Sequence, residues 1–146
     1  MNYVCSEVER LVDRALAEDL VLDDATTCAI IPPTLNTTAF IKSNGHGILA
    51  GAEVALLVFS RLDPDLTGQL PKEDGSPITP DDIVVTITGS VASILRGERT
   101  ALNFLQRMSG IATETDKYVR AVQDLRTRIM ATVVYNFLTN VYLTLG

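Results

Sequence analysis

The amino-acid sequence predicts a single α+β domain. Three observations lead to this class: apolar residues recur at helical spacing in several stretches, β-branched residues dominate two stretches between them, and no linker or internal repeat divides the chain. With 146 residues, of which 47% are hydrophobic and 21% charged, the chain has the composition of one globular domain with a core. The predicted order is helix, strands, helix, strand, helices.

The first predicted helix covers residues 4–20. Its apolar side chains recur on one face, and Ser6 and Glu9 have the spacing of a capping box just ahead of that face. An acidic and hydroxyl-rich stretch ends the helix, and Pro32-Pro33 forbids any helix from continuing. We therefore expect a loop before the first strand.

Residues 37–62 predict strands and a second helix. β-branched and aromatic residues mark 37–43, and Asn44-Gly45 is a strong turn signal ahead of the apolar residues 48–50, which predicts a β-hairpin or two linked strands. Residues 52–62 return to helical spacing and stop at Asp63-Pro64.

The next part predicts turns, a strand and two helices. Residues 65–82 hold glycines and prolines among charged residues, which favours turns with one short strand. Residues 83–89 are the clearest strand, and Ser90 is placed to cap the helix after it. Two helices follow, at 98–108 and 111–123, separated by Ser109-Gly110.

The charge balance argues against nucleic acid as a partner. Twelve basic and eighteen acidic residues give a formal net charge of −6, the wrong sign for a sequence-independent hold on phosphates. Basic residues concentrate only between positions 96 and 128, where they suffice to attract a small anion.

Cysteine content and hydropathy predict a cytoplasmic protein. Cys5 and Cys28 show neither metal-ligand spacing nor the density of a disulfide scaffold, which indicates reduced thiols. The first residues lack a basic segment followed by an apolar one, and no apolar run approaches the roughly eighteen residues of a membrane span. We expect no membrane partner.

Candidates for catalysis or metal binding are few. The only histidine, His46, lies in an Asn-Gly-His-Gly turn, where solvent exposure is the simplest role, so no nucleophilic triad can be assembled. The acidic pairs at 18–19 and 23–24 could hold a metal, but without a nearby histidine or third carboxylate they are more simply solvated charges. The sequence therefore predicts no catalytic and no metal-ligating residue.

Segment 96–113 offers a candidate anion site. One interpretation is structural: two packed helices, with Glu98 at a helix start where the dipole favours negative charge. Arg99 lies in that same first turn, where a cation is disfavoured unless an anion accompanies it. Beside Thr100 and Asn103, its guanidinium could bind a carboxylate in bidentate fashion.

The same segment resembles a known family. Residues 97–113 read GERTALNFLQRMSGIAT, which is similar to the GERTALNFLQRLSGIAT segment that quinolinate phosphoribosyltransferases carry between their N-terminal domain and their barrel. Weaker resemblance extends over nearly the whole chain up to about residue 132, at positions 15–20 with 24–27, 45–55, and 74–75 with 88–89. The resemblance implies an N-terminal α/β sandwich domain at 1–110, a helix and strand start at 111–132 leading to the barrel, and an α/β barrel that is essentially absent.

Two departures from the family pattern stand out. Val21 and Asp23 occupy positions where glycines are common, so the first loop must have a different backbone geometry. Residues 133–146 form an uncharged tail that does not resemble the family. We expect that coding continuity is lost after Thr132, through a retained intron, a frameshift or a gene-model error. Alignment of genomic DNA with a transcript tests this, because an uninterrupted spliced message encoding the tail would contradict it.

The resemblance also implies a function. The family is a group of pentosyltransferases of NAD biosynthesis that form nicotinate mononucleotide, CO2 and pyrophosphate from quinolinate and phosphoribosyl pyrophosphate, with Mg²⁺ accompanying the donor. In the family dimer the N-terminal domain of one chain closes the barrel of the other, and Arg99 matches an arginine that reaches a quinolinate carboxylate across that interface. The other site residues belong to the barrel, so we expect no cofactor in this chain and no activity from it alone.

Two alternatives stay open. The chain could be a non-catalytic interaction domain that forms a homodimer or docks onto a full-length homologue, supplying Arg99 in trans or blocking that dimer. It could also be a molybdenum-associated phosphoribosyltransferase-like protein, whose junction segment is a looser relative of this one. The unbroken ERTALNFLQR run favours the quinolinate family.

Overall fold

The computed structural model describes residues 6–32, 34–126 and 129. These residues form an α+β domain, as predicted, and contain no barrel. The elements in chain order are α1 (Ser6–Ile30), β1 (Asn36–Lys42), β2 (Gly47–Ile48), α2 (Ala52–Leu62), β3 (Thr67–Gln69), β4 (Pro77–Ile78), β5 (Ile83–Ser90) and α3 (Val91–Ala121).

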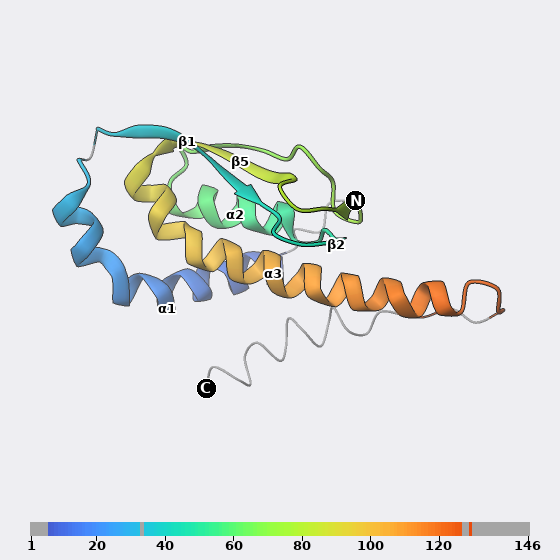
Figure 1. Cartoon of the computed structure of the whole chain (residues 1–146). Helices are drawn as coiled ribbons and strands as arrows, with labels where there is room; N and C mark the ends of the chain where they lie inside the picture. The colour runs from blue at the N-terminus through green and yellow to red at the C-terminus, as the bar shows by residue number, and fades with distance from the viewer. Residues whose placement is uncertain (1–5, 33, 127–128, 130–146) are drawn as a thin grey trace.

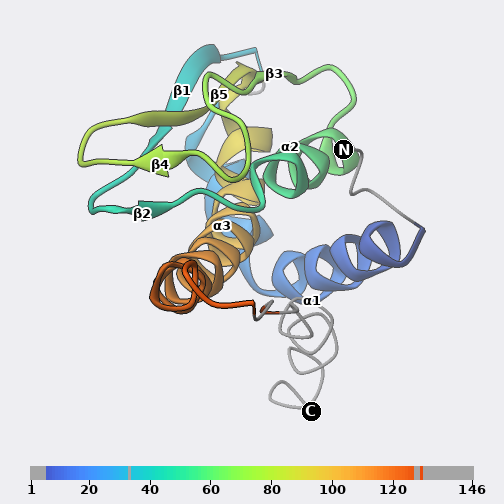
Figure 2. The ribbon, with the colours of Figure 1, turned by 90° about the vertical axis from the view of Figure 1, so that its right-hand side faces the viewer.

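An antiparallel sheet of three strands forms one layer of the domain, in the order β1-β5-β3; β1 and β5 are labelled in Figure 1, and all three strands in Figure 2. The central strand β5 is rich in β-branched residues, which suit a pleated and half-buried surface. Its register places Thr88 opposite Thr38, and their hydroxyls lie 2.9 Å apart on the exposed face. On the other face Val85 and Ile87 are buried. The register shifts between Ile41 and Lys42, which pair with Val85 and Ile83, so Val84 of β5 is the extra residue at this irregularity.

The helices cover the buried face of the sheet. α2 and α3 pack against each other and against β5, and α1 packs on α2 and α3 (Figures 1 and 2). The core lies between these layers, where Val12 of α1, Val58 of α2 and Val85 of β5 have no exposed surface. Burial of apolar side chains from all three layers is the main favourable term in folding such a domain.

The first helix is longer than predicted. α1 continues through the acidic stretch after residue 20, where we expected a loop, and ends at Ile30, two residues before Pro32. No glycine or proline lies between residues 20 and 31, because Val21 and Asp23 replace the glycines common in the family. Aspartate and threonine are only mildly unfavourable in helices, so the first effective stop is the proline.

The predicted hairpin is wrong in its pairing, whereas the two linked strands are confirmed. β1 pairs with the distant β5, and the short β2 pairs with β4 as Gly47 opposite Ile78 and Ile48 opposite Pro77. Segment 65–82 therefore holds two short strands, β3 and β4, where the sequence predicted one. Because both have partners far away in sequence, local turn signals could not identify them.

The predicted break at Ser109-Gly110 is also wrong. α3 runs without interruption from Val91 to Ala121, and Ser90 caps it as predicted, since its hydroxyl accepts a hydrogen bond from Ser93 N at 3.4 Å. A glycine inside a helix costs only about 1 kcal/mol relative to alanine. Tertiary hydrogen bonds from Ser109 and Thr113 hold this part of α3 to the segment around β2, and they offset that cost.

A distant carboxylate caps α2. The cap residue Gly51 has a left-handed backbone with φ of 89°, and its own position offers no side-chain oxygen. Asp74 replaces that oxygen, because its two carboxylate oxygens accept hydrogen bonds from Gly51 N at 2.8 Å and Ala52 N at 3.0 Å. Two of the unpaired amides at the helix start are thereby satisfied, and the negative charge lies at the positive end of the helix.

A second acidic group fixes the turn before β5. Asp82 accepts hydrogen bonds from Lys72 Nζ at 2.6 Å and from Thr79 N at 2.7 Å. The Lys72 hydrogen bond, aided by the Thr79 amide, lowers the pKa of Asp82 to about 2.

Within the described residues, no helix combines the length and the apolar character that crossing a membrane requires.

Substitution by alanine should change the free energy of unfolding in opposite directions at two glycines of α3, Gly97 and Gly110. A Cβ at Gly97 would lie 2.8 Å from Phe59 Cδ1, so we expect Gly97→Ala to lower the free energy of unfolding by about 1–3 kcal/mol. Gly110 has open space around it, so Gly110→Ala should raise that free energy by about 0.5–1 kcal/mol. Urea unfolding followed by circular dichroism measures both. Destabilisation by Gly110→Ala would contradict a continuous helix.

The contribution of Asp82 to stability should depend on pH. Because its folded pKa of about 2 lies below the ordinary value of 3.8, the carboxylate stabilises the fold above pH 3.8 and loses this effect as pH falls toward 2. We expect Asp82→Asn to be less stable than wild type at pH 6 and the difference to vanish near pH 2. Asp65→Asn, an exposed site, controls for the loss of one negative charge. A gap in stability that is constant from pH 6 to pH 2 would disprove the assignment.

Candidate functional site

α3 has one face buried in the domain and one face open to solvent. The open face carries Arg99, Asn103, Gln106 and Gly110, which follow one another at helical spacing and are all exposed. The segment that carries the family resemblance therefore has one face committed to the fold and one free to meet a ligand or partner. The opposite face supplies the core with Ile94, Gly97, Ala101, Phe104 and Leu105.

Arg99, the predicted substrate-binding residue, lies on the open face with 69% of its side chain exposed. The sequence placed it in the first turn of a helix, and this is wrong because α3 begins at Val91. At that distance from the helix start the dipole has little influence on a cation. Its anionic partner comes from α1, where Asp19 Oδ1 lies 4.0 Å from Arg99 Nε. Within the described part of the chain, Asp19 is the only ion-pair partner of Arg99.

The second carboxylate oxygen of Asp19 accepts a hydrogen bond from α3. The Thr100 hydroxyl donates a short hydrogen bond to Asp19 Oδ2, and Thr100 itself is only 2% exposed. Of two adjacent residues of α3, Thr100 thus hydrogen-bonds to one oxygen of this carboxylate, and Arg99 lies within ion-pair distance of the other. Sequence reasoning considered the acidic pair at 18–19 only as a metal site or a solvated charge, and it could not have found this contact because the partners are 81 residues apart.

The described residues do not form a metal centre. No group of three histidine, cysteine, aspartate or glutamate side chains among them is placed to hold a metal ion. We assign no step of the chemistry to a metal bound by this domain.

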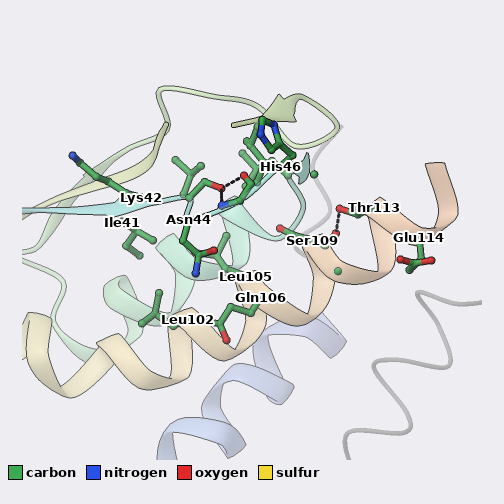
Figure 3. A pocket seen from close by; sticks show the side chains of 17 residues that line it. Ile41, Lys42, Asn44, His46, Leu102, Leu105, Gln106, Ser109, Thr113 and Glu114 are labelled. Atoms are coloured by element: carbon green, nitrogen blue, oxygen red, sulfur yellow. Dashed lines mark hydrogen bonds between the residues drawn. The ribbon is translucent and has the colours of Figure 1, made fainter. Parts of the chain in front are cut away.

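A cleft of about 550 Å³ runs beside α3 (Figure 3). Its apolar lining includes Leu102 and Leu105 of α3 and Ile41 of β1, and Asn44 reaches from the β1–β2 loop toward α3. His46 also lines the cleft and is exposed, so the solvated turn position predicted for it is confirmed. Sequence reasoning did not identify the cleft, because segments far apart in the chain form its walls.

Ser109 and Thr113 fasten one wall of the cleft. Ser109 Oγ accepts a hydrogen bond from Ala50 N at 3.0 Å and donates one to Ala50 O at 3.1 Å. Thr113 Oγ1 accepts from Ile48 N at 2.9 Å. The approach is close, since a Cβ at Gly47 would lie 2.6 Å from Thr113 Oγ1. These hydroxyls therefore fix the segment around β2 to α3.

Comparison with known proteins identifies the type of domain. The family model described as quinolinate phosphoribosyl transferase, N-terminal domain, matches residues 24–109. A probable carboxylating nicotinate-nucleotide pyrophosphorylase from Synechocystis is 40% identical over 117 residues, which cover 80% of this chain and 39% of the relative. The protein of the same name from Bacillus subtilis is 33% identical over 132 residues, which cover 90% and 45%. The crystal structure of NadC from Streptococcus pyogenes matches with a TM-score of 0.78 at 39% identity, over 83% of this chain and 44% of that one.

The chain spans about two fifths of the length of these relatives. The two sequence relatives are both nicotinate-nucleotide pyrophosphorylases, which supports the quinolinate family over the molybdenum-associated alternative. The role of Arg99 and the boundaries at 110 and 132 stay predictions, although α3 runs through position 110. The predicted tail at 133–146 lies outside the described residues.

Proposed function

Because the chain belongs to the quinolinate phosphoribosyltransferase family, we propose that it acts in the formation of nicotinate mononucleotide by placing Arg99 against a carboxylate of quinolinate. The observation that carries this proposal is an arginine on the open face of α3 that is mostly exposed and lies 4.0 Å, measured from Nε, from a carboxylate that accepts a hydrogen bond from Thr100. The proposed reaction joins the ring nitrogen of quinolinate to the phosphoribosyl group of phosphoribosyl pyrophosphate, with release of pyrophosphate and CO2.

Bidentate binding explains why arginine suits this position. A planar guanidinium offers parallel N–H donors that match the two oxygens of a carboxylate in spacing and direction. Quinolinate carries two carboxylates on a small rigid ring, so fixing one of them also fixes the direction of the ring nitrogen. Correct orientation of reacting groups lowers the barrier by removing the entropic cost of aligning them.

We propose that a barrel domain supplies the rest of the site. Phosphoribosyl pyrophosphate carries several phosphate charges, and its transition state needs several preorganised cations around the leaving group. On α3, the exposed neighbours of Arg99 at helical spacing are the neutral side chains of Asn103 and Gln106, and one further cation, Arg107, is exposed beside them. We propose that the barrel of a second chain, either a copy or a full-length homologue, provides those cations, and that this domain closes it.

The compartment forms part of the proposal. The cytoplasm fits the low cysteine content, since cytoplasmic thiols stay reduced and structural disulfides are rare there. The same domain, without any contribution to catalysis, would serve as an interaction module that binds or blocks a homologue.

Rescue in trans tests the role of Arg99. We expect the purified chain alone to form no nicotinate mononucleotide. The Bacillus subtilis relative, carrying alanine at the position that aligns with Arg99, should lose activity and regain at least about tenfold when this chain is added in excess, because one well-oriented charged contact is worth roughly 1.5–3 kcal/mol. Nicotinate mononucleotide is measured by chromatography.

Arg120→Ala provides a matched control for Arg99→Ala. Arg120 lies on the same helix, is equally 69% exposed, and pairs through Nε with Asp116 at 2.7 Å. Arg99→Ala should fail to rescue, whereas Arg120→Ala should rescue like wild type. Equal rescue by both would overturn the role of Arg99. Inhibition of the intact relative by every variant, with co-elution in size-exclusion chromatography, would instead establish the interaction module.

A further inference from the structure

Asp19 has a specific spatial relation to Arg99 that the family resemblance does not account for. We propose that Asp19 is a positioning residue, which holds the Arg99 guanidinium by its Nε side so that the terminal nitrogens remain available to a ligand carboxylate. The structural part of this inference concerns order in the Arg99 side chain. Its functional part rests on the proposed role of Arg99 in binding quinolinate.

The carboxylate of Asp19 is itself fixed. Its Oδ2 accepts the short hydrogen bond from Thr100, and the Thr100 side chain is buried at 2% exposure, so this hydroxyl cannot turn toward solvent. Oδ1 then faces Arg99 Nε at 4.0 Å. Only 24% of the Asp19 side chain is exposed, compared with 69% for Arg99. The aspartate is therefore the more buried of the two side chains, and it lies within ion-pair distance of the more exposed arginine.

The geometry of a guanidinium explains how an acidic partner at Nε can favour binding of a carboxylate ligand. The group presents five N–H donors, one on Nε and four on the two terminal nitrogens. An acidic partner on the Nε side leaves the terminal pair free, and a carboxylate ligand can occupy that pair in bidentate fashion. Without Asp19, a mostly exposed arginine samples many rotamers, and binding must then restrict them.

Asp19 also opposes the ligand, because both are negatively charged. The repulsion is weakened by the guanidinium that lies between them and by solvent around the largely exposed Arg99. Orientation is therefore expected to outweigh repulsion, and removal of the charge should weaken quinolinate binding. The opposite result, tighter binding by Asp19→Asn, would mean that repulsion dominates and would overturn the functional part of the inference.

NMR of the arginine Nε–Hε groups in the purified chain tests the structural part. In wild type, the Arg99 Nε–Hε heteronuclear NOE should exceed that of a freely mobile arginine, and Asp19→Asn should lower it and speed Hε exchange with water at least about threefold. Asparagine keeps the shape of aspartate and can still accept from Thr100. Thr100→Val should give an intermediate loss, because it frees the carboxylate without removing its charge.

Asp116→Asn is the matched control. It removes the carboxylate that pairs with Arg120 Nε, so it should change the Arg120 signal and leave the Arg99 signal as in wild type. Melting temperatures of all variants establish that the fold is retained. An Arg99 signal in Asp19→Asn identical to wild type overturns the inference, whatever the enzymatic assay gives.

The rescue assay tests the functional part. When the alanine variant of the relative is rescued with the Asp19→Asn chain, KM for quinolinate should be about 2- to 10-fold higher than with the wild-type chain, the range expected for ordering one long side chain. KM for phosphoribosyl pyrophosphate should be unchanged. Equal changes in both KM values would indicate a general structural defect and contradict positioning. If no chain rescues, including wild type, the proposed function fails, and the NMR result alone then decides whether Asp19 orders Arg99.

Discussion

The close contact between α2 and α3 at Gly97 determines where the functional side chains of this domain lie. Phe59 and Leu62 of α2 pack directly over Gly97, where a Cβ would lie 2.8 Å from Phe59 Cδ1 and 3.1 Å from Leu62 Cδ1. Such a contact fixes both the separation and the rotation of the two helices, because densely packed interiors tolerate little displacement. Rotation of α3 in turn decides which residues enter the core and which, like Arg99 two positions later, face outward.

The segment with the strongest family resemblance therefore serves two requirements at once. Its buried members form the core beneath the sheet, its hydroxyl groups at 109 and 113 attach the segment around β2, and Thr100 fixes the carboxylate of Asp19. Its exposed members have no comparable structural duty in the described residues. Arg99 is solvated, and inside the domain it forms the 4.0 Å ion pair with Asp19, so the fold leaves most of its guanidinium accessible.

Local sequence signals predicted those elements whose boundaries are local. The helix at 52–62 was predicted at its observed limits because an apolar stripe ends at Asp63-Pro64, and the strand from residue 83 was clear from its β-branched run. The hairpin and the break at Ser109-Gly110 were wrong because distant partners decide both, namely β5 for β1 and Ala50 for Ser109. For the same reason Arg99 could be predicted as a candidate from resemblance, whereas its partner Asp19 could not.

The position of α1 has a consequence for biosynthesis. The apolar side chains Val8, Leu11, Val12 and Leu16 are buried, and in the described part of the chain α1 packs on α2 and α3. Asp19 and Thr100 are 81 residues apart in the sequence. α1 therefore emerges from the ribosome well before α3 emerges to pack against it. At elongation rates of about 5–20 residues per second, α1 waits roughly 4–16 seconds for α3, whereas α2, which covers the other part of its apolar stripe, emerges earlier. During that interval the nascent chain presents an amphipathic helix that α3 does not yet cover, and the contact between Asp19 and Thr100 forms only when α3 has emerged.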